Sequence, residues 1–93
     1  NHMNTKSIDM TVNSVTDTYR QYPTVVVEFT KKNGDKRTMV TTSRGLPLDK
    51  PVFTDTTCVV IEVTPERRDY RSYDITDVIS MRAYVEQPKE LFL

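Results

Sequence analysis

Apolar and polar residues alternate along several short segments of the chain, and a two-residue period is typical of a β-strand with one buried face. The clearest case is Thr24–Thr30, in which Val25, Val27 and Phe29 share one face. The alternation resumes in Lys36–Thr42. These two segments therefore predict a β-hairpin.

The turn of this hairpin falls on Asn33-Gly34. An Asn-Gly pair favours a two-residue type I′ turn, because both central residues of that turn need a positive φ. Such a turn would pair Val27 with Val40 and Phe29 with Thr38. The core face of the hairpin is then expected to consist of Val25, Val27, Phe29 and Val40.

Further strands are predicted for residues 58–64, 70–75 and 79–85, and residues 8–15 are assigned to the first strand. Residues 76–78 are too few for an α-helix and are expected to form one 3₁₀ turn before the last strand. Fourteen Thr and twelve Val against one Ala favour strands, so almost no helix is expected.

The predicted fold class is all-β, with five or six short strands in a small twisted barrel or a strongly bent sheet. Closure into a barrel would remove the unpaired backbone groups at the edges of an open sheet. Residues 43–57 carry Gly45, Pro47 and Pro51 and are expected to form a loop across the barrel mouth. The predicted core comprises Val25, Val27, Phe29, Val40, Val59, Ile61, Ile79 and Met81.

The length of 93 residues predicts one domain with a single small core. Asn1 and His2 are interpreted as a cloning remnant, which leaves residues 3–93 as one β-barrel domain without a native His. With one Cys and no native His, neither a Cys/His metal site nor a His-activated nucleophile can be assembled. We therefore expect no enzyme activity, no cofactor and no metal.

Charge and hydropathy limit the possible partners. Thirteen basic and thirteen acidic residues give a formal net charge of zero, so binding to nucleic acid would depend on local patches. The longest apolar run is too short to span a bilayer, and no membrane partner is expected. The single Cys58 lies in an apolar run and is expected to be a buried thiol. One Cys allows no disulfide framework, which suits the reducing cytoplasm.

Three separated segments resemble a known family. Residues 29–39 (Phe-Thr-Lys-Lys-Asn-Gly-Asp-Lys-Arg-Thr-Met), the loop with Leu46-Pro47, and residues 70–80 (Tyr-Arg-Ser-Tyr-Asp-Ile-Thr-Asp-Val-Ile-Ser) resemble the small WYL-like proteins of bacteriophages. These are relatives of the WYL domains of bacterial regulators, and the resemblance covers residues 25–82. Where those regulators carry Trp-Tyr-Leu, this chain has Cys58-Val59-Val60.

The resemblance implies an SH3-like or Sm-like β-barrel. It also implies a phage origin, a location in the host cytoplasm during infection, and a regulatory binding role. Its Arg-x-aromatic element corresponds to Arg71-Ser72-Tyr73 in this chain.

Two basic clusters are the candidate binding sites for nucleic acid or another partner. The first is the hairpin tip, where Lys31, Lys32, Lys36 and Arg37 outnumber Asp35 and could contact phosphates. The second interleaves Arg67, Arg68 and Arg71 with Tyr70 and Tyr73, as a surface for single-stranded nucleic acid would require. The alternatives are that the tip is only solvated, and that Tyr73 belongs to the core while Arg71 pairs with a carboxylate.

Two function hypotheses follow. In the first, a non-enzymatic regulatory module binds host or phage nucleic acid, or acts on transcription, through the basic hairpins, weakly and with strong salt dependence. In the second, the chain inhibits a host protein through a strand edge or through its apolar tail, Leu91, Phe92 and Leu93. If the basic residues of the two hairpins converge on one face, the first hypothesis gains support, and if they scatter, the second gains it.

Overall fold

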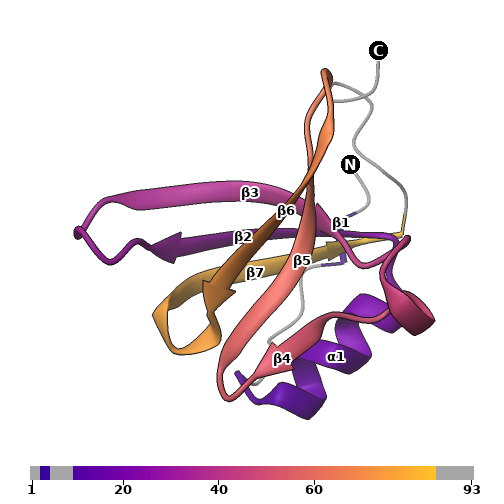
Figure 1. The fold of residues 1–93 in the computed structure, drawn as a ribbon, viewed down its shortest axis with the longest axis horizontal. Helices are drawn as coiled ribbons and strands as arrows, with labels where there is room; N and C mark the ends of the chain where they lie inside the picture. Colours follow the sequence, from indigo (N-terminus) through magenta and orange to yellow (C-terminus); the bar gives the residue numbers. More distant parts are fainter. Residues whose placement is uncertain (1–2, 5–9, 86–93) are drawn as a thin grey trace.

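The computed structural model describes residues 3–4 and 10–85 of the chain (Figure 1). This part is mostly β. It contains one α-helix, α1 (Val12–Gln21), and two 3₁₀ turns, η1 (Pro47–Asp49) and η2 (Ile75–Asp77). Its strands are β1 (Met3–Asn4), β2 (Thr24–Thr30), β3 (Lys36–Thr42), β4 (Val52–Thr54), β5 (Thr57–Val63), β6 (Arg68–Asp74) and β7 (Val78–Tyr84).

The helix α1 corrects the prediction of an all-β chain, and with it the assignment of residues 8–15 to a first strand. Thr11 caps the helix, because its side chain accepts a hydrogen bond from the Ser14 N–H at 3.1 Å. The helix ends before Pro23, whose ring disfavours the helical conformation of Tyr22. Val15 and Tyr19, four residues apart, form its buried face. Tertiary packing of this face outweighs the low helix propensity of the Val and Thr residues.

The hairpin of β2 and β3 has the predicted strand bounds but a different turn. The Gly34 N–H donates to the Lys31 carbonyl at 2.9 Å, and Gly34 has a φ of 94°. This is a turn closed by a left-handed glycine, and it pairs Val27 with Met39 and Phe29 with Arg37. The positive φ of Gly34 confirms that part of the prediction, whereas the type I′ register was wrong by one residue.

The sheet is antiparallel, with the order β1-β7-β2-β3-β5-β4, and β6 is added to β5. One edge of β5 pairs with β6 along its whole length, while the other edge is shared between β4 and β3. No ladder joins β6 to β7 among the described strands, so this sheet is not closed. The helix α1 lies below the sheet in Figure 1, under the beginning of β2 and the end of β7.

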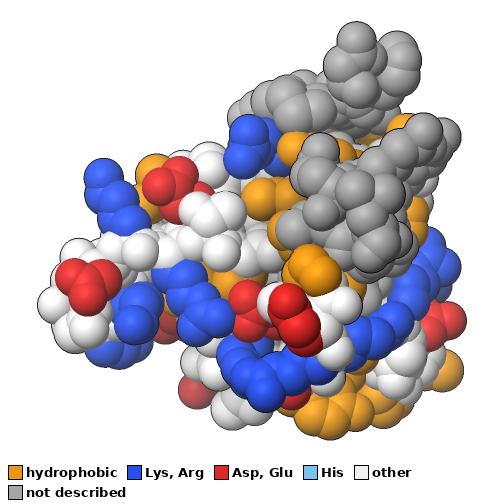
Figure 2. Space-filling model, turned by 90° about the horizontal axis from the view of Figure 1, so that it is seen from above, with side chains coloured by type: hydrophobic (Ala, Val, Ile, Leu, Met, Phe, Trp, Pro, Cys, Tyr) orange, Lys and Arg blue, Asp and Glu red, His pale blue; other side chains and the backbone are white. Residues whose placement is uncertain are grey.

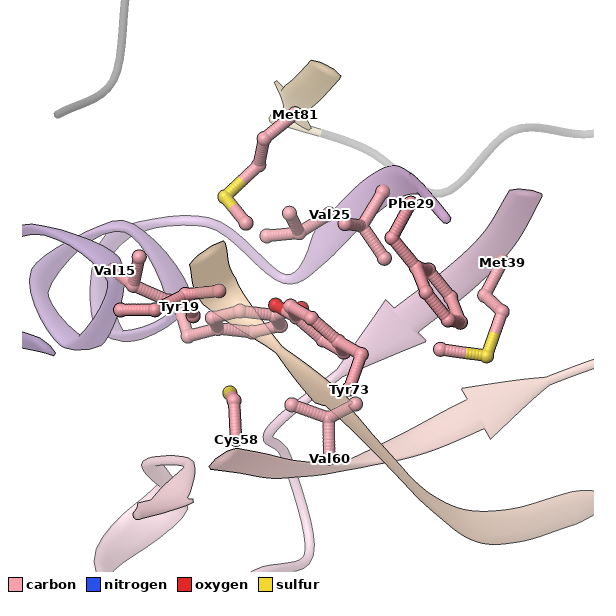
Figure 3. Packing of buried hydrophobic residues seen from close by; sticks show 11 residues of the cluster. Val15, Tyr19, Val25, Phe29, Met39, Cys58, Val60, Tyr73 and Met81 are labelled. Carbon is pink, nitrogen blue, oxygen red and sulfur yellow. The ribbon is translucent and has the colours of Figure 1, made fainter. Parts of the chain in front are cut away.

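The main core fills the space between α1 and the inner face of the sheet (Figure 3). The predicted core residues Val25, Val27, Phe29 and Met81 are buried here. The other buried members of this cluster are Val15, Tyr19, Met39, Cys58, Val60, Tyr73 and Ile75.

Three predicted core residues lie elsewhere. Val40 is only partly buried because the shifted register turns Met39 inward in its place. Val59 is also only partly buried, because Cys58 and Val60 supply the inner face of β5. Ile79 is exposed because it is the extra residue of a β-bulge, where Glu28 pairs with Ser80 and Phe29 with Val78.

Ile61 is buried, but in a second cluster on the outer face of β5, together with Leu46 and Val63. Leu46 comes from the loop between β3 and β4, which therefore covers β5 from the other side. Because both faces of β5 are covered, its apolar alternation could not indicate which face belongs to the main core.

A row of buried hydroxyl groups crosses the main core. The hydroxyl of Tyr19 lies 2.6 Å from Thr41 Oγ1 and 2.9 Å from the hydroxyl of Tyr73. Thr41 Oγ1 in turn donates to the Val25 carbonyl at 2.6 Å. In Figure 3 the two tyrosine rings point toward each other from α1 and β6. The Tyr19 hydroxyl of α1 is thus bonded to β3 through Thr41 and to β6 through Tyr73.

The carbonyl at the end of this row fixes the direction of its hydrogen bonds. A carbonyl only accepts, so the single hydroxyl proton of Thr41 is committed to Val25. Tyr19 must therefore donate to Thr41, and Tyr73 must donate to Tyr19. Each buried hydroxyl of the row has a partner, which avoids the cost of burying an unpaired polar group.

The register of the hairpin can be tested with two truncations in adjacent positions. Met39 is 2% exposed, so Met39→Ala should lower the free energy of unfolding by about 2 to 4 kcal/mol. Val40→Ala removes a partly buried side chain and should cost less than about 1 kcal/mol. Urea denaturation of both variants measures the difference. Equal losses, or a larger loss for Val40→Ala, would contradict the observed register.

The row of phenols also predicts a loss of stability in alkali. Burial raises the pKa of the Cys58 thiol from 9.0 to about 12, and burial raises the pKa values of Tyr19 and Tyr73 above 10.0. Above pH 9 the unfolded chain therefore binds fewer protons than the folded chain. The free energy of unfolding should be level below pH 8.5 and should fall between pH 9 and 12, by at most about 1.4 kcal/mol per pH unit for each group.

Urea denaturation at pH 7.5, 9.0 and 10.5 measures this fall. In Cys58→Ala the decline should begin about one pH unit later, because only the phenols then titrate. A stability that stays constant to pH 10.5 would show that these groups are not buried as described.

Candidate binding site

A hollow of about 600 Å³ lies between the β2–β3 hairpin, the end of β6 and the turn η2. One wall comes from the hairpin and includes Lys31, Lys32 and Arg37. The opposite wall includes Ser72, Asp74 and Asp77. Phe29 and Tyr73 lie at its base, with ring centroids 5.6 Å apart and planes inclined by 27°.

The base of the hollow belongs to the core. Tyr73 is buried, and its hydroxyl donates to Tyr19, so its ring is held from below. A nucleobase has little surface to stack on when the ring is only 3% exposed and already stacks on Phe29. This geometry agrees with the alternative in which Tyr73 is a core residue.

Lys32 joins the two walls of the hollow. Its Nζ lies 3.0 Å from Asp77 Oδ2 and 4.0 Å from Asp74 Oδ2. The hydrogen bond to Asp77 raises the pKa of Lys32. Hydrogen bonds from the hydroxyl and the N–H of Thr76 lower the pKa of Asp74, which caps η2. Because Lys32 is exposed, these contacts hold the hairpin tip only loosely against η2.

A second group of charges borders the hollow on the inner face of the sheet. The Oε1 atom of Glu62 lies 2.8 Å from Arg37 Nη2 and 3.2 Å from Arg71 Nε. The side chain of Glu62 is 13% exposed, so its charge is largely withdrawn from water and compensated by two guanidinium groups. Arg71 also approaches Asp69 Oδ2 at 3.6 Å. The predicted pairing of Arg71 with a carboxylate is therefore confirmed.

The remaining predicted site residues do not gather at the hollow. Arg67 lies at the tip of the β5–β6 hairpin and pairs with Asp69 at 2.6 Å. Arg68 donates to the Arg44 carbonyl at 2.6 Å. Lys36 follows the alternation of Thr38 and Val40 and lies on the opposite face from Arg37. The tail residues Leu91, Phe92 and Leu93 lie outside the described residues.

The basic residues are therefore divided between two hairpins that point in different directions in Figure 1, so they do not converge on one face, and the convergence that would support the first hypothesis is not observed. Figure 2 shows Lys and Arg side chains at the hairpin end and in a band toward the other side of the molecule, with acidic side chains between them. Five of the seven basic site residues already contact an acceptor of the same chain. They are Lys32, Arg37, Arg67, Arg68 and Arg71.

Sequence reasoning missed Glu62 and Tyr19. Glu62 breaks the apolar run of β5, and a carboxylate within a central strand indicates a buried ion pair. Tyr19 follows Val12 and Val15 at helical spacing, and Pro23 ends that pattern. These two signals were present in the sequence, but their partners are 9 to 54 residues away along the chain.

No group of three or more His, Cys, Asp or Glu residues in residues 3–4 and 10–85 could hold a metal ion. Burial raises the pKa of Cys58, so its thiol is protonated near neutral pH and is a poor nucleophile. The one helix of this part of the chain falls short of the length and hydropathy needed to cross a bilayer.

The Glu62 bridge can be tested by removing its charge. Glu62→Gln leaves the half-buried Arg37 without an anion, while Arg71 keeps only its longer contact with Asp69, so the free energy of unfolding should fall by roughly 1 to 3 kcal/mol. Glu66→Gln, in the exposed turn between β5 and β6, removes the same charge and is the matched control. Urea denaturation of both variants gives the comparison. A loss no larger than that of Glu66→Gln would mean that the bridge contributes nothing.

No family model, curated protein or solved structure matches this chain.

Proposed function

We propose that the protein is a non-enzymatic regulatory binding module that holds a single-stranded nucleic acid in the hollow beside the β2–β3 hairpin. One observation carries this proposal: Lys31, Lys32 and Arg37 line the same wall of a cavity of about 600 Å³. Ammonium and guanidinium groups bind phosphate mainly by releasing counterions from the nucleic acid.

The size of the hollow favours one strand over a duplex. A cavity of this volume is in the range of sites that hold a small molecule. One nucleotide is a molecule of that size. Asp74 and Asp77 on the opposite wall would repel a second phosphate backbone. Because the Phe29 and Tyr73 rings at the floor of the hollow are buried, the site would contact phosphate and sugar and would discriminate little between base sequences.

The family and the barrel remain proposals. An SH3-like barrel opened between β6 and β7 is supported by the pairing of β2 with both β3 and β7. It is also supported by the 3₁₀ turn that directly precedes the last strand. The WYL-like resemblance, the phage origin and a role in the host cytoplasm rest on the sequence segments alone.

Inhibition of a host protein is the second candidate. The observation in its favour is that most of the basic site residues are already paired within the chain. A chain without net charge would also give little electrostatic attraction for a polyanion.

A pair of charge-matched double variants tests the nucleic-acid proposal. Lys31→Gln with Lys32→Gln removes two exposed cations from the hollow. Lys36→Gln with Lys50→Gln removes two exposed cations that do not line it. Fluorescence anisotropy with a labelled dT12 oligonucleotide at 20 mM salt measures binding. We expect weak binding for the wild type and the control, and weaker but measurable binding for the first variant.

The salt dependence gives a second readout. Two lost phosphate contacts should reduce the slope of log K against log salt by about 1.4. Arg37 is left unchanged, because its pairing with Glu62 ties it to the stability of the sheet. No binding by the wild type, or equal binding by the two variants, would reject the proposal and favour a protein partner.

A further inference from the structure

Strand β6 has one edge without a partner in the described part of the chain. It pairs with β5 from Arg68 to Asp74, and no other described strand lies against it. Figure 1 shows the β5–β6 hairpin rising above the rest of the sheet, whereas Ser72 and Asp74 at the other end of β6 line the hollow beside the β2–β3 hairpin. A seven-residue open edge is long enough to add another strand.

Two hydrogen bonds at the ends of the β5–β6 ladder identify the backbone groups of this edge. The Thr64 N–H donates to the Arg67 carbonyl at 2.9 Å, and the Ile75 N–H donates to the Thr56 carbonyl at 3.0 Å. Bonded and non-bonded pairs alternate in an antiparallel ladder. Residues 69, 71 and 73 therefore point their backbone groups at β5. Those of residues 68, 70, 72 and 74 point outward.

The middle of this edge carries an exposed aromatic residue. Tyr70 is 67% exposed, although its neighbours Tyr73 and Ile75 are buried. Its carbonyl accepts a hydrogen bond from Arg71 Nη1 at 2.9 Å, which leaves a second lone pair for an incoming strand. Exposed tyrosines are frequent in contact surfaces, because the ring adds apolar area and the hydroxyl tolerates water.

The charges of β6 indicate what kind of strand fits. Arg68 and Arg71 are balanced by Asp69 and Asp74, so an acidic peptide would meet repulsion as well as attraction. A second copy of β6, running antiparallel, carries the same charges in reverse order. If Tyr70 lies opposite Tyr70 of the other copy, Asp69 lies opposite Arg71, and Arg68 lies opposite Ser72.

We propose that β6 is a self-association edge, through which two copies of the chain form a twofold dimer centred on Tyr70. The outward groups of residues 68, 70 and 72 fall in bonded pairs in this register, as an antiparallel ladder requires. Asp69 and the partner's Arg71 fall in the non-bonded pairs, where side chains approach most closely. The twofold axis closes the assembly at two copies and covers both edges.

The contact area limits the strength of such a dimer. Five residues from each copy bury less than the roughly 1,200 Å² of a standard stable interface. Association should therefore be reversible and visible only at high protein concentration. A net charge of zero removes the overall repulsion between copies.

Sedimentation velocity of the full chain from 5 to 500 µM tests the proposal. The weight-average mass should rise with concentration toward twice 10.8 kDa and should not pass it. In Ser72→Pro the dimer should be lost, because the ring blocks the outward N–H of residue 72. The same change leaves the β5–β6 hydrogen bonds intact, so the thermal midpoint of the monomer should be preserved.

Two further variants test the register and do not depend on a proline. In a Ser72→Glu dimer, the new carboxylate of each copy lies opposite the partner's Arg68, which gives two new ion pairs. The dimerisation affinity should therefore rise by about fivefold. Ser72→Lys, a side chain of similar length at the same exposed position, should weaken it by a similar factor. The difference between the two should disappear at 1 M salt.

Three results would overturn the proposal. The first is a wild type that remains monomeric at 500 µM. The second is a dimer that Ser72→Glu and Ser72→Lys affect equally, since that would place the contact elsewhere. The third is a folded Ser72→Pro variant that dimerises as tightly as the wild type, since residue 72 would then not take part in the contact.

Discussion

The hydroxyl of Tyr19 is the contact on which the arrangement of helix and sheet depends. It bonds Thr41 of β3 and Tyr73 of β6, two strands that do not pair with each other. Strands β3 and β5 share only two residue pairs, Thr41 with Glu62 and Thr42 with Ile61. The sheet is thus two smaller sheets joined at a short seam. The helix and the Arg37–Glu62 bridge hold them together on the inner side.

Local patterns predicted the strands well and the helix poorly. The bounds of β2 and β3, the 3₁₀ turn before the last strand and the positive φ of Gly34 all follow from alternation and turn chemistry. The segment that forms α1 is rich in Val and Thr, so its composition suggested a strand. Its helical state depends on burying Val15 and Tyr19 against distant strands, which a local pattern does not contain.

The same limit applies to the candidate site. The two basic clusters could be located from the sequence, and Lys31, Lys32 and Arg37 do lie around one hollow. Their partners could not be located, because Lys32 meets Asp77 and Arg37 meets Glu62 across 45 and 25 residues. The register error at the β2–β3 turn shows how much one residue matters. A type I′ turn would have placed Arg37 on the opposite face, away from Glu62.

The pairing of β2 with β7 affects the order in which the chain can fold during synthesis. Thr24 pairs with Tyr84, so β2 gains this neighbour only after residue 84 has left the ribosome. Tyr19 likewise waits for Tyr73. The two hairpins can form earlier because their strands are adjacent in sequence. Until residue 84 has been synthesised, chaperones and proteases can reach Val25, Val27 and the apolar face of the helix. A nascent chain is therefore vulnerable for most of its translation.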